Sequence, residues 1–154
     1  MDYQLSLQAH CPTCQQVIRE SPAQRGTVRS SADVYARCEG MQTLEQEELH
    51  VFTLDRRNHI VDRTMVYRGN CGSAMVRAAE VFKPAVLAGA SGIIVVHNHP
   101  SGDPTPSADD VRVTRELAAA GKCLDIELLD HLVVGDSQHG FVSLRERKLG
   151  FDAS

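Results

Sequence analysis

Short runs of mainly apolar residues alternate with stretches of helical periodicity along this chain. The apolar runs predict five strands, at 49–54, 60–67, 93–96, 124–134 and 141–143. Residues 55–58 separate the first two runs and have the composition of a turn, so we expect a hairpin there. The β-branched run at 93–96 is typical of a central strand.

Apolar residues at helical spacing predict three helices, at about 31–45, at about 75–89 and at 107–121. Ser30 or Ser31 could cap the first helix, and Ser107 could cap the third. Gly121 is expected to end the third helix. Because helices and strands alternate, the sequence predicts an α/β or α+β layered domain.

Composition places the chain among ordinary globular proteins. It has 154 residues, of which 42% are hydrophobic and 23% are charged, so we expect one domain with its own core and exclude disorder. No apolar run approaches the roughly 18 residues that a membrane-spanning helix needs. Residues 1–30 are polar and rich in turn formers, and we interpret them as an N-terminal extension before a domain at 31–154.

Charge and cysteine content further narrow the possible partners of the protein and its cellular compartment. The 16 Lys and Arg residues are scattered and are outnumbered by 20 Asp and Glu residues, which argues against non-specific binding to nucleic acid. The five cysteines are an odd number, unlike a secreted disulfide framework. The N-terminus lacks the positive and apolar regions of a signal peptide. We therefore expect a cytoplasmic protein.

The segment 97–110 carries the candidate chemistry. His97 and His99 are two positions apart at the end of a predicted strand, so both side chains can point to one face and hold one ion. Asp110 lies in the first turn of the next helix and could complete a set of three ligands. That set would leave the fourth position of a tetrahedral zinc open for water, as in catalytic zinc sites. Without metal, Ser107 and Asp110 would still form an ordinary capping box.

The same residues fit a longer pattern of His-x-His-Pro, six residues, Ser, two residues and Asp. It is met at His97, His99, Pro100, Ser107 and Asp110. The pattern resembles the JAMM motif of the JAB/MPN metallohydrolases. The strings HNHPSGDPTPSADD at 97–110 and LLDHLVVG at 128–135 resemble the RadC-like branch of that superfamily. The resemblance covers about residues 30–150.

This resemblance implies a cytidine-deaminase-like three-layer α/β sandwich with a central mixed sheet. It implies a zinc ion held by His97, His99 and Asp110. The Ser107 hydroxyl would stabilise the oxyanion, besides or instead of capping the helix. With zinc as cofactor, the family activates a water molecule for hydrolysis.

The family also has a glutamate that acts as general acid and base on the zinc water. That glutamate lies two residues before a large apolar residue and eight before the Asp that ends an early strand. Counting back from Asp55 gives Glu47, with Leu49 as the apolar residue. Glu45 and Glu48 are the competitors, although Glu48 would point to the opposite face of the strand. A solvated glutamate in an acidic turn is the alternative interpretation of Glu47.

Other polar residues give weaker signals. Asp130 and His131 resemble a pair of the RadC-like branch, and His131 could orient a zinc ligand through a hydrogen bond. The alternative is a polar pair that only pins the strand. Cys123 is interpreted as a small buried apolar residue. We interpret the remaining histidines of the domain as structural: His50, His59 and His139.

His10, Cys11 and Cys14 form a short cluster in the N-terminal extension. One C-x-x-C pair is half of a zinc knuckle or a redox dithiol, and a structural zinc needs four ligands. A tight turn with free thiols is our default interpretation.

Three functions compete. The first is a zinc-dependent peptidase or isopeptidase acting on a peptide or protein. The second is a DNA-repair protein acting on or with nucleic acid, which only the RadC name implies. The third is a non-catalytic MPN scaffold, but such domains typically lose the metal ligands that this chain keeps. A zinc deaminase is rejected, because its C-x-x-C would follow its histidine motif.

The chain departs from the RadC-like pattern in one place. Those chains usually have Pro-Arg-Glu where this one has Ala78-Ala79-Glu80, which could alter a contact on the substrate side. Longer RadC-like proteins also carry a segment resembling a helix–hairpin–helix DNA-binding module. We expect the 30 or so residues before the domain to be too few for it.

Overall fold

A mixed β-sheet lies at the centre of the molecule. The computed structural model describes residues 26–69 and 76–151. Within them the sheet has five strands: β1 (Glu48–Leu54), β2 (Ile60–Arg68), β3 (Gly92–Asn98), β4 (Glu127–Val134) and β5 (Phe141–Ser143). The strand order is β2-β1-β3-β4-β5. Only β3 and β4 pair in parallel, and the other neighbours are antiparallel.

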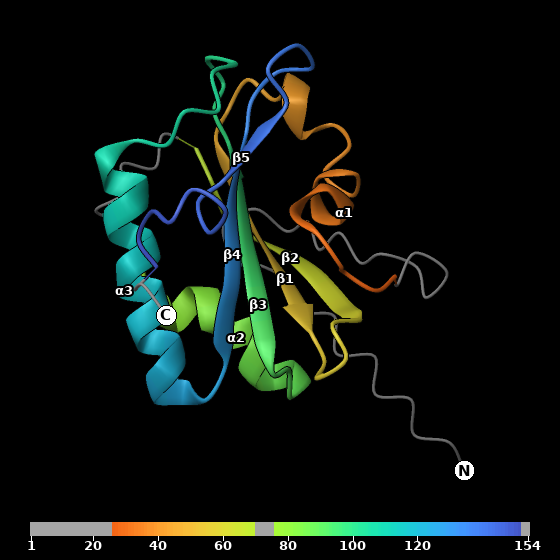
Figure 1. The fold of residues 1–154 in the computed structure, drawn as a ribbon, viewed down its shortest axis with the longest axis vertical. Helices are drawn as coiled ribbons and strands as arrows, with labels where there is room; N and C mark the ends of the chain where they lie inside the picture. Colours follow the sequence, from red (N-terminus) through yellow and green to blue (C-terminus); the bar gives the residue numbers. More distant parts are fainter. Residues whose placement is uncertain (1–25, 70–75, 152–154) are drawn as a thin grey trace.

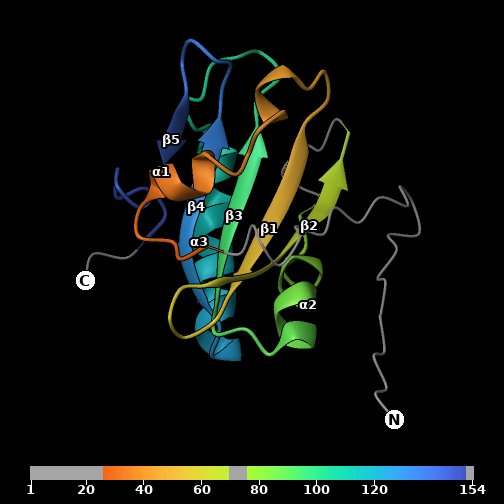
Figure 2. The same ribbon diagram turned by 90° about the vertical axis from the view of Figure 1, so that its right-hand side faces the viewer.

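Helices cover both faces of this sheet. They are α1 (Ser31–Tyr35), α2 (Ala78–Ala88) and α3 (Ala108–Leu124), with a 3₁₀ turn η2 at Met41–Thr43. Figure 1 shows the sheet nearly edge on, with α2 and α3 on one side and α1 on the other. Figure 2 shows α1 in front of the sheet and α3 behind it. The predicted three-layer α/β sandwich with a mixed sheet is therefore confirmed.

The alternation of side chains along β1 and β3 explains the two cores. Val51 and Val95 face α2 and α3, where they pack with Phe82 and Leu117. Their neighbours face α1 and join a second cluster: Phe52, Leu54, Ile94 and Val96. Because β3 is buried on both faces, its sequence is a continuous apolar run rather than an alternating one.

The first predicted helix is wrong in its length. Ser30 caps α1 and forms a capping box with Asp33, but the helix ends at Tyr35 instead of continuing to residue 45. Gly40 follows with a positive φ of 88°, which breaks helical continuity, and only the short η2 comes after it. Val34 and Met41 both fall within the predicted helix at 31–45, but they are buried from two separate short elements.

The predicted end of the third helix is also wrong. Helix α3 continues past Gly121 to Leu124, and Asp125 in the left-handed region ends it. Gly121 is buried at a point where α3 packs closely against Ile126 and Phe82. A Cβ there would lie 2.4 Å from the carbonyl oxygen of Ile126 and 3.2 Å from the Phe82 ring. The absence of a side chain at this position therefore permits close packing rather than ending the helix.

The topology places the site at one end of the sheet. Strand β3 extends to Asn98, so His97 belongs to the strand and His99 follows it directly. Helix α3 connects the parallel strands β3 and β4, so its N-terminus starts near the carboxyl end of β3. Ligand sites in α/β proteins commonly occupy this position. None of the helices in the described ranges is long and apolar enough to cross a membrane.

Candidate metal centre

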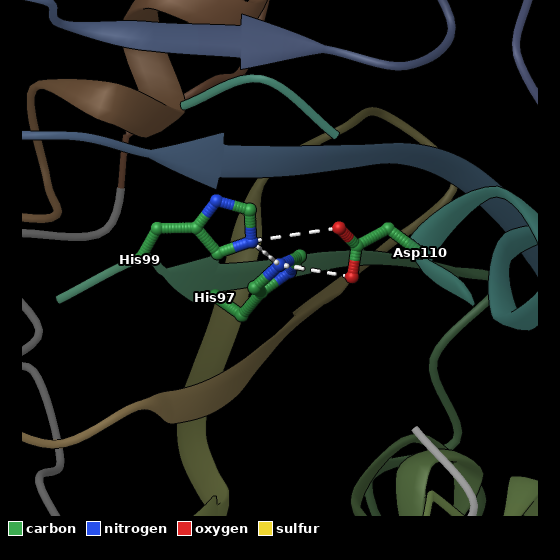
Figure 3. A group of neighbouring side chains, drawn as sticks. All are labelled: His97, His99 and Asp110. Carbon is green, nitrogen blue, oxygen red and sulfur yellow. Dashed lines mark hydrogen bonds and ion pairs between the residues drawn. The ribbon is translucent and has the colours of Figure 1, made fainter. Parts of the chain in front are cut away.

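Three potential metal ligands converge beyond the end of β3. His97 Nε2 and His99 Nε2 are 3.1 Å apart. The Asp110 carboxylate, in the first turn of α3, lies 3.3 Å from His97 Nε2 through Oδ1 and 3.4 Å from His99 Nε2 through Oδ2. Figure 3 shows the two rings and the carboxylate pointing toward one another. The structure thus brings together the three residues that the sequence proposed as metal ligands.

The hydrogen bonds of His99 assign its tautomer. His99 Nδ1 lies 2.8 Å from the carbonyl oxygen of Asp103, which can only accept. The ring therefore carries its hydrogen on Nδ1 and donates it to that carbonyl. The Nε2 lone pair is left facing His97 and Asp110. A turn in the loop after β3 thus prepares His99 to bind a cation through Nε2.

A relay of hydrogen bonds, which runs from Thr114 through His131 to His97, assigns the tautomer of His97. The Thr114 hydroxyl has one hydrogen and donates it to the carbonyl oxygen of Asp110, at 2.6 Å. The Thr114 hydroxyl oxygen is also 2.6 Å from His131 Nδ1, so this oxygen must accept a hydrogen from that nitrogen. His131 Nε2 is then an acceptor, and His97 Nδ1 donates to it at 2.8 Å. The lone pair of His97 Nε2 therefore points toward His99 and Asp110.

The electrostatics of the cluster favour a bound cation. Without a cation, a proton on Nε2 of His97 or His99 takes its place and is donated to Asp110. Burial alone would raise the pKa of Asp110, but these hydrogen bonds from His97 and His99 hold that pKa well below its ordinary value. The hydrogen bond to Asp110 likewise raises the pKa of His99. Burial lowers the pKa of His131 to about 3, so this ring stays neutral and its Nε2 can accept the hydrogen bond from His97.

The donor set fits a zinc ion. Two imidazole lone pairs and a carboxylate face one small space, and without a cation they would repel one another. The spacings of 3.1, 3.3 and 3.4 Å match the roughly 3.3 Å edge of a tetrahedron whose bonds are about 2.0–2.1 Å long. Two imidazoles and one carboxylate are also a ligand set that zinc accepts while keeping a fourth position open.

Glu47 lies in the wall of the cavity that contains these ligands. The cavity has a volume of about 180 Å³ and is lined by Glu47, Leu49, Val76, His97, His99, Ser107, Asp109, Asp110, Val113 and His131. Burial raises the pKa of Glu47, while the nearby His97 and His99 act in the opposite direction. A carboxylate with a raised pKa is suited to proton transfer near neutral pH.

The two competing glutamates lie elsewhere. Glu48 is buried on the opposite face of β1, where its carboxylate contacts His50 Nε2 and Arg68 Nε, each at 2.8 Å. Glu45 is exposed and does not line the cavity. Of the three acidic residues that the sequence left open, only Glu47 faces the candidate metal ligands.

Ser107 caps α3 and orients Asp110. Its hydroxyl accepts from the backbone N–H of Asp110 at 3.1 Å, and its own N–H donates to Asp110 Oδ2 at 2.7 Å. The hydroxyl also donates to Asp110 Oδ2, at 2.8 Å. The capping box and the candidate ligand set therefore share the Asp110 carboxylate. The cap fixes Oδ2, and Oδ1 remains turned toward His97.

The side chains of Asp130 and His131 lie on opposite faces of β4 and have different partners. Asp130 is buried away from the metal centre and accepts from the Ser143 hydroxyl, which holds β5 against β4. His131 contacts His97 on the other face. Sequence reasoning named His131 but missed Thr114, because the relay joins residues that are close only in space. No spacing rule links Thr114 with β4.

The other histidines and cysteines that the sequence analysis named lie away from the candidate metal ligands or outside the described residues. His50 is a buried structural residue that contacts Glu48 and accepts a hydrogen bond from Arg63 Nε at 3.1 Å. His59 and His139 contact aspartates in turns. The interpretation of Cys123 as buried is wrong, because it lies exposed near the end of α3. Three of the sequence candidates fall outside the described residues: His10, Cys11 and Cys14.

Fold and site together define a JAB-type α/β domain with a candidate metal centre. Comparison with known families agrees, since a family model described as RadC-like JAB domain matches residues 16–149. The chain belongs to the RadC-like JAB domain family.

Curated relatives that share this domain are called UPF0758 proteins. The protein of that name from Chloroflexus aurantiacus is 46% identical over 148 residues, which cover 96% of this chain and 64% of the relative. The one from Roseiflexus castenholzii is 51% identical over 111 residues, or 72% of this chain and 47% of the relative. The chain therefore spans less than two thirds of the length of these relatives.

The relay predicts that Thr114 affects metal affinity without contacting the metal. Replacing Thr114 by Val keeps the shape but removes the acceptor of His131 Nδ1–H, so the His97 tautomer is no longer fixed. We expect zinc affinity to fall by about 10–100-fold, the usual effect of losing such an outer hydrogen bond. Competition with a chromogenic chelator measures it.

Thr53→Val is the matched control for this variant, because the buried Thr53 hydroxyl also donates to a backbone carbonyl, that of Asp62. It should leave zinc affinity unchanged. Equal affinities of wild type and Thr114→Val would show that the relay does not hold His97.

Proposed function

We propose that this chain is a zinc-dependent hydrolase that cleaves peptide or isopeptide bonds in a peptide or protein substrate. The observation that carries the proposal is the convergence of three cation-binding groups beside the half-buried carboxylate of Glu47 in one cavity. His97, His99 and Asp110 would hold the metal. A zinc ion there would lower the pKa of a coordinated water molecule to about 7 and polarise the scissile carbonyl.

The residues of the chain divide the remaining work. Glu47 accepts a proton from the attacking water as its oxygen bonds to the carbonyl carbon, and then delivers that proton to the leaving amine as the C–N bond breaks. The Ser107 hydroxyl turns from Asp110 toward the carbonyl oxygen and donates a hydrogen bond to it as negative charge develops. His131 and Thr114 keep His97 in its binding tautomer.

Metal removal tests the proposal. The probes are internally quenched linear peptides and peptides branched through a Lys ε-amide. Wild-type turnover should disappear after dialysis against a chelator and return when one equivalent of zinc is added. Glu47→Gln serves as the blank for contaminating peptidases. Cleavage that persists without metal, and equally in Glu47→Gln, would contradict the proposal.

Nucleic acid is the less favoured substrate. Two basic side chains of β2 are already engaged with residues of β1, Arg63 with His50 and Arg68 with Glu48. The net charge of −4 also disfavours contacts with a phosphate backbone.

A further inference from the structure

Asn98 lies between the two metal-binding histidines in sequence, but its side chain points to the opposite face of β3. It is 1% exposed, so its amide must find partners within the protein. Its Oδ1 accepts from the backbone N–H of Glu48 at 2.7 Å, and its Nδ2 donates to the carbonyl oxygen of Gln46 at 3.1 Å. Both partners are backbone groups with fixed roles, which assigns the orientation of the amide unambiguously.

These two hydrogen bonds hold the two peptide groups on either side of Glu47. One peptide group joins residues 46 and 47, and the other joins residues 47 and 48. Holding both restricts φ and ψ of Glu47 and so fixes the direction of its Cα–Cβ bond. The Glu47 carbonyl is held from the other side by the N–H of Gly69, at 2.9 Å.

The clamp lies where the strand pairing stops. The ladder between β1 and β3 ends at the pair Leu49 and His97, one residue short of Glu48 and Asn98. Beyond that point the Asn98 amide takes the place of a backbone peptide group. Without it, the segment that carries Glu47 would lose its attachment to β3.

We propose that Asn98 is a positioning residue that fixes Glu47 relative to the metal centre by clamping the backbone on both sides of it. The inference rests on the proposed function, because it assigns Glu47 the proton transfer. Since Asn98 is covalently joined to His97 and His99, any movement of the ligands carries the base with it. A base misplaced by about 1 Å can cost on the order of 10²-fold in rate.

The first test uses metal-free protein and no substrate. In Asn98→Ala the Glu48 amide loses its acceptor, so its hydrogen exchange should be at least about tenfold faster relative to the Val51 amide in the middle of β1. The control is Thr53→Ala, which truncates a buried polar residue at the far end of β1. In this control the ratio should stay at the wild-type value. An unchanged ratio in Asn98→Ala would overturn the proposal.

The second test separates positioning from metal binding. Asn98→Ala should keep zinc affinity within about threefold of wild type, while kcat on a cleaved peptide falls by about 10²-fold and KM is unchanged. Zinc affinity that falls as far as kcat would overturn the proposal, because Asn98 would then act on the ligands. A kcat equal to that of Thr53→Ala would overturn it as well.

Asn98→Asp provides a variant of nearly the same shape. It keeps an acceptor for the Glu48 N–H but has no donor for the Gln46 carbonyl. The Glu48 amide should therefore stay protected while kcat falls by less than in Asn98→Ala. A kcat equal to wild type would overturn the two-sided clamp. Failure of Glu47→Gln to lose activity would instead refute the proposed function, and the exchange test would still report on the clamp.

Discussion

Replacing Glu47 by Gln should lower kcat by about 10²–10⁴-fold while the metal stays bound. Gln has almost the same shape but cannot accept and return a proton, so the attacking water loses its base and the leaving amine its acid. The cavity and the three candidate ligands are unchanged by the substitution. Steady-state kinetics on a cleaved quenched peptide, together with elemental analysis of each sample, gives both quantities.

Glu45→Gln is the matched control for this variant. Glu45 is an exposed neighbour with the same charge, so its loss tests whether local negative charge alone matters. We expect wild-type kcat and metal content from it. If Glu47→Gln turned over as fast as Glu45→Gln, Glu47 would not be the base, whatever the metal content.

Replacing Asp110 by Ala should remove the bound metal. The two histidines that remain are too few for a zinc site, which uses at least three protein ligands. A ligand that binds only the folded protein stabilises it, by about 2.7 kcal/mol at 100 times its Kd. Zinc should therefore raise the Tm of the wild type but leave that of Asp110→Ala unchanged.

The helix cap needs its own control, because Asp110 also completes the capping box of α3. Asp33→Ala is that control, since Asp33 has the same position in the capping box of α1 and lies away from the cavity. Its Tm should fall by the loss of a cap, yet it should still rise with zinc. A zinc-dependent rise in Asp110→Ala would place the metal elsewhere in the chain.

Local patterns predicted much of the fold. The hairpin of β1 and β2 follows from a turn between two apolar runs, and the continuous apolar run of β3 follows from burial on both faces. The first helix was predicted too long, because the left-handed conformation of Gly40 interrupts an otherwise helical spacing. The third helix was predicted too short, because the glycine at position 121 is required by close packing and not by helix termination.

Spacing along a strand pointed to His97 and His99 as candidate ligands, since they are two positions apart. Glu47 became a candidate only through the family resemblance, and strand alternation served to set Glu48 aside. The supporting contacts were not predictable, because they join separate elements. Thr114 on α3 meets His131 on β4, and the Asn98 amide binds backbone groups about 50 positions earlier.

The central claim is that His97, His99 and Asp110 together hold one metal ion. Zinc K-edge X-ray absorption on the full chain loaded with one equivalent of zinc tests it most directly. The account predicts only nitrogen and oxygen neighbours, at about 2.0–2.1 Å, and loss of the bound zinc in Asp110→Ala. Sulfur neighbours at about 2.3 Å, which would point to cysteine ligands such as Cys11 and Cys14, or no zinc bound at all, would contradict it.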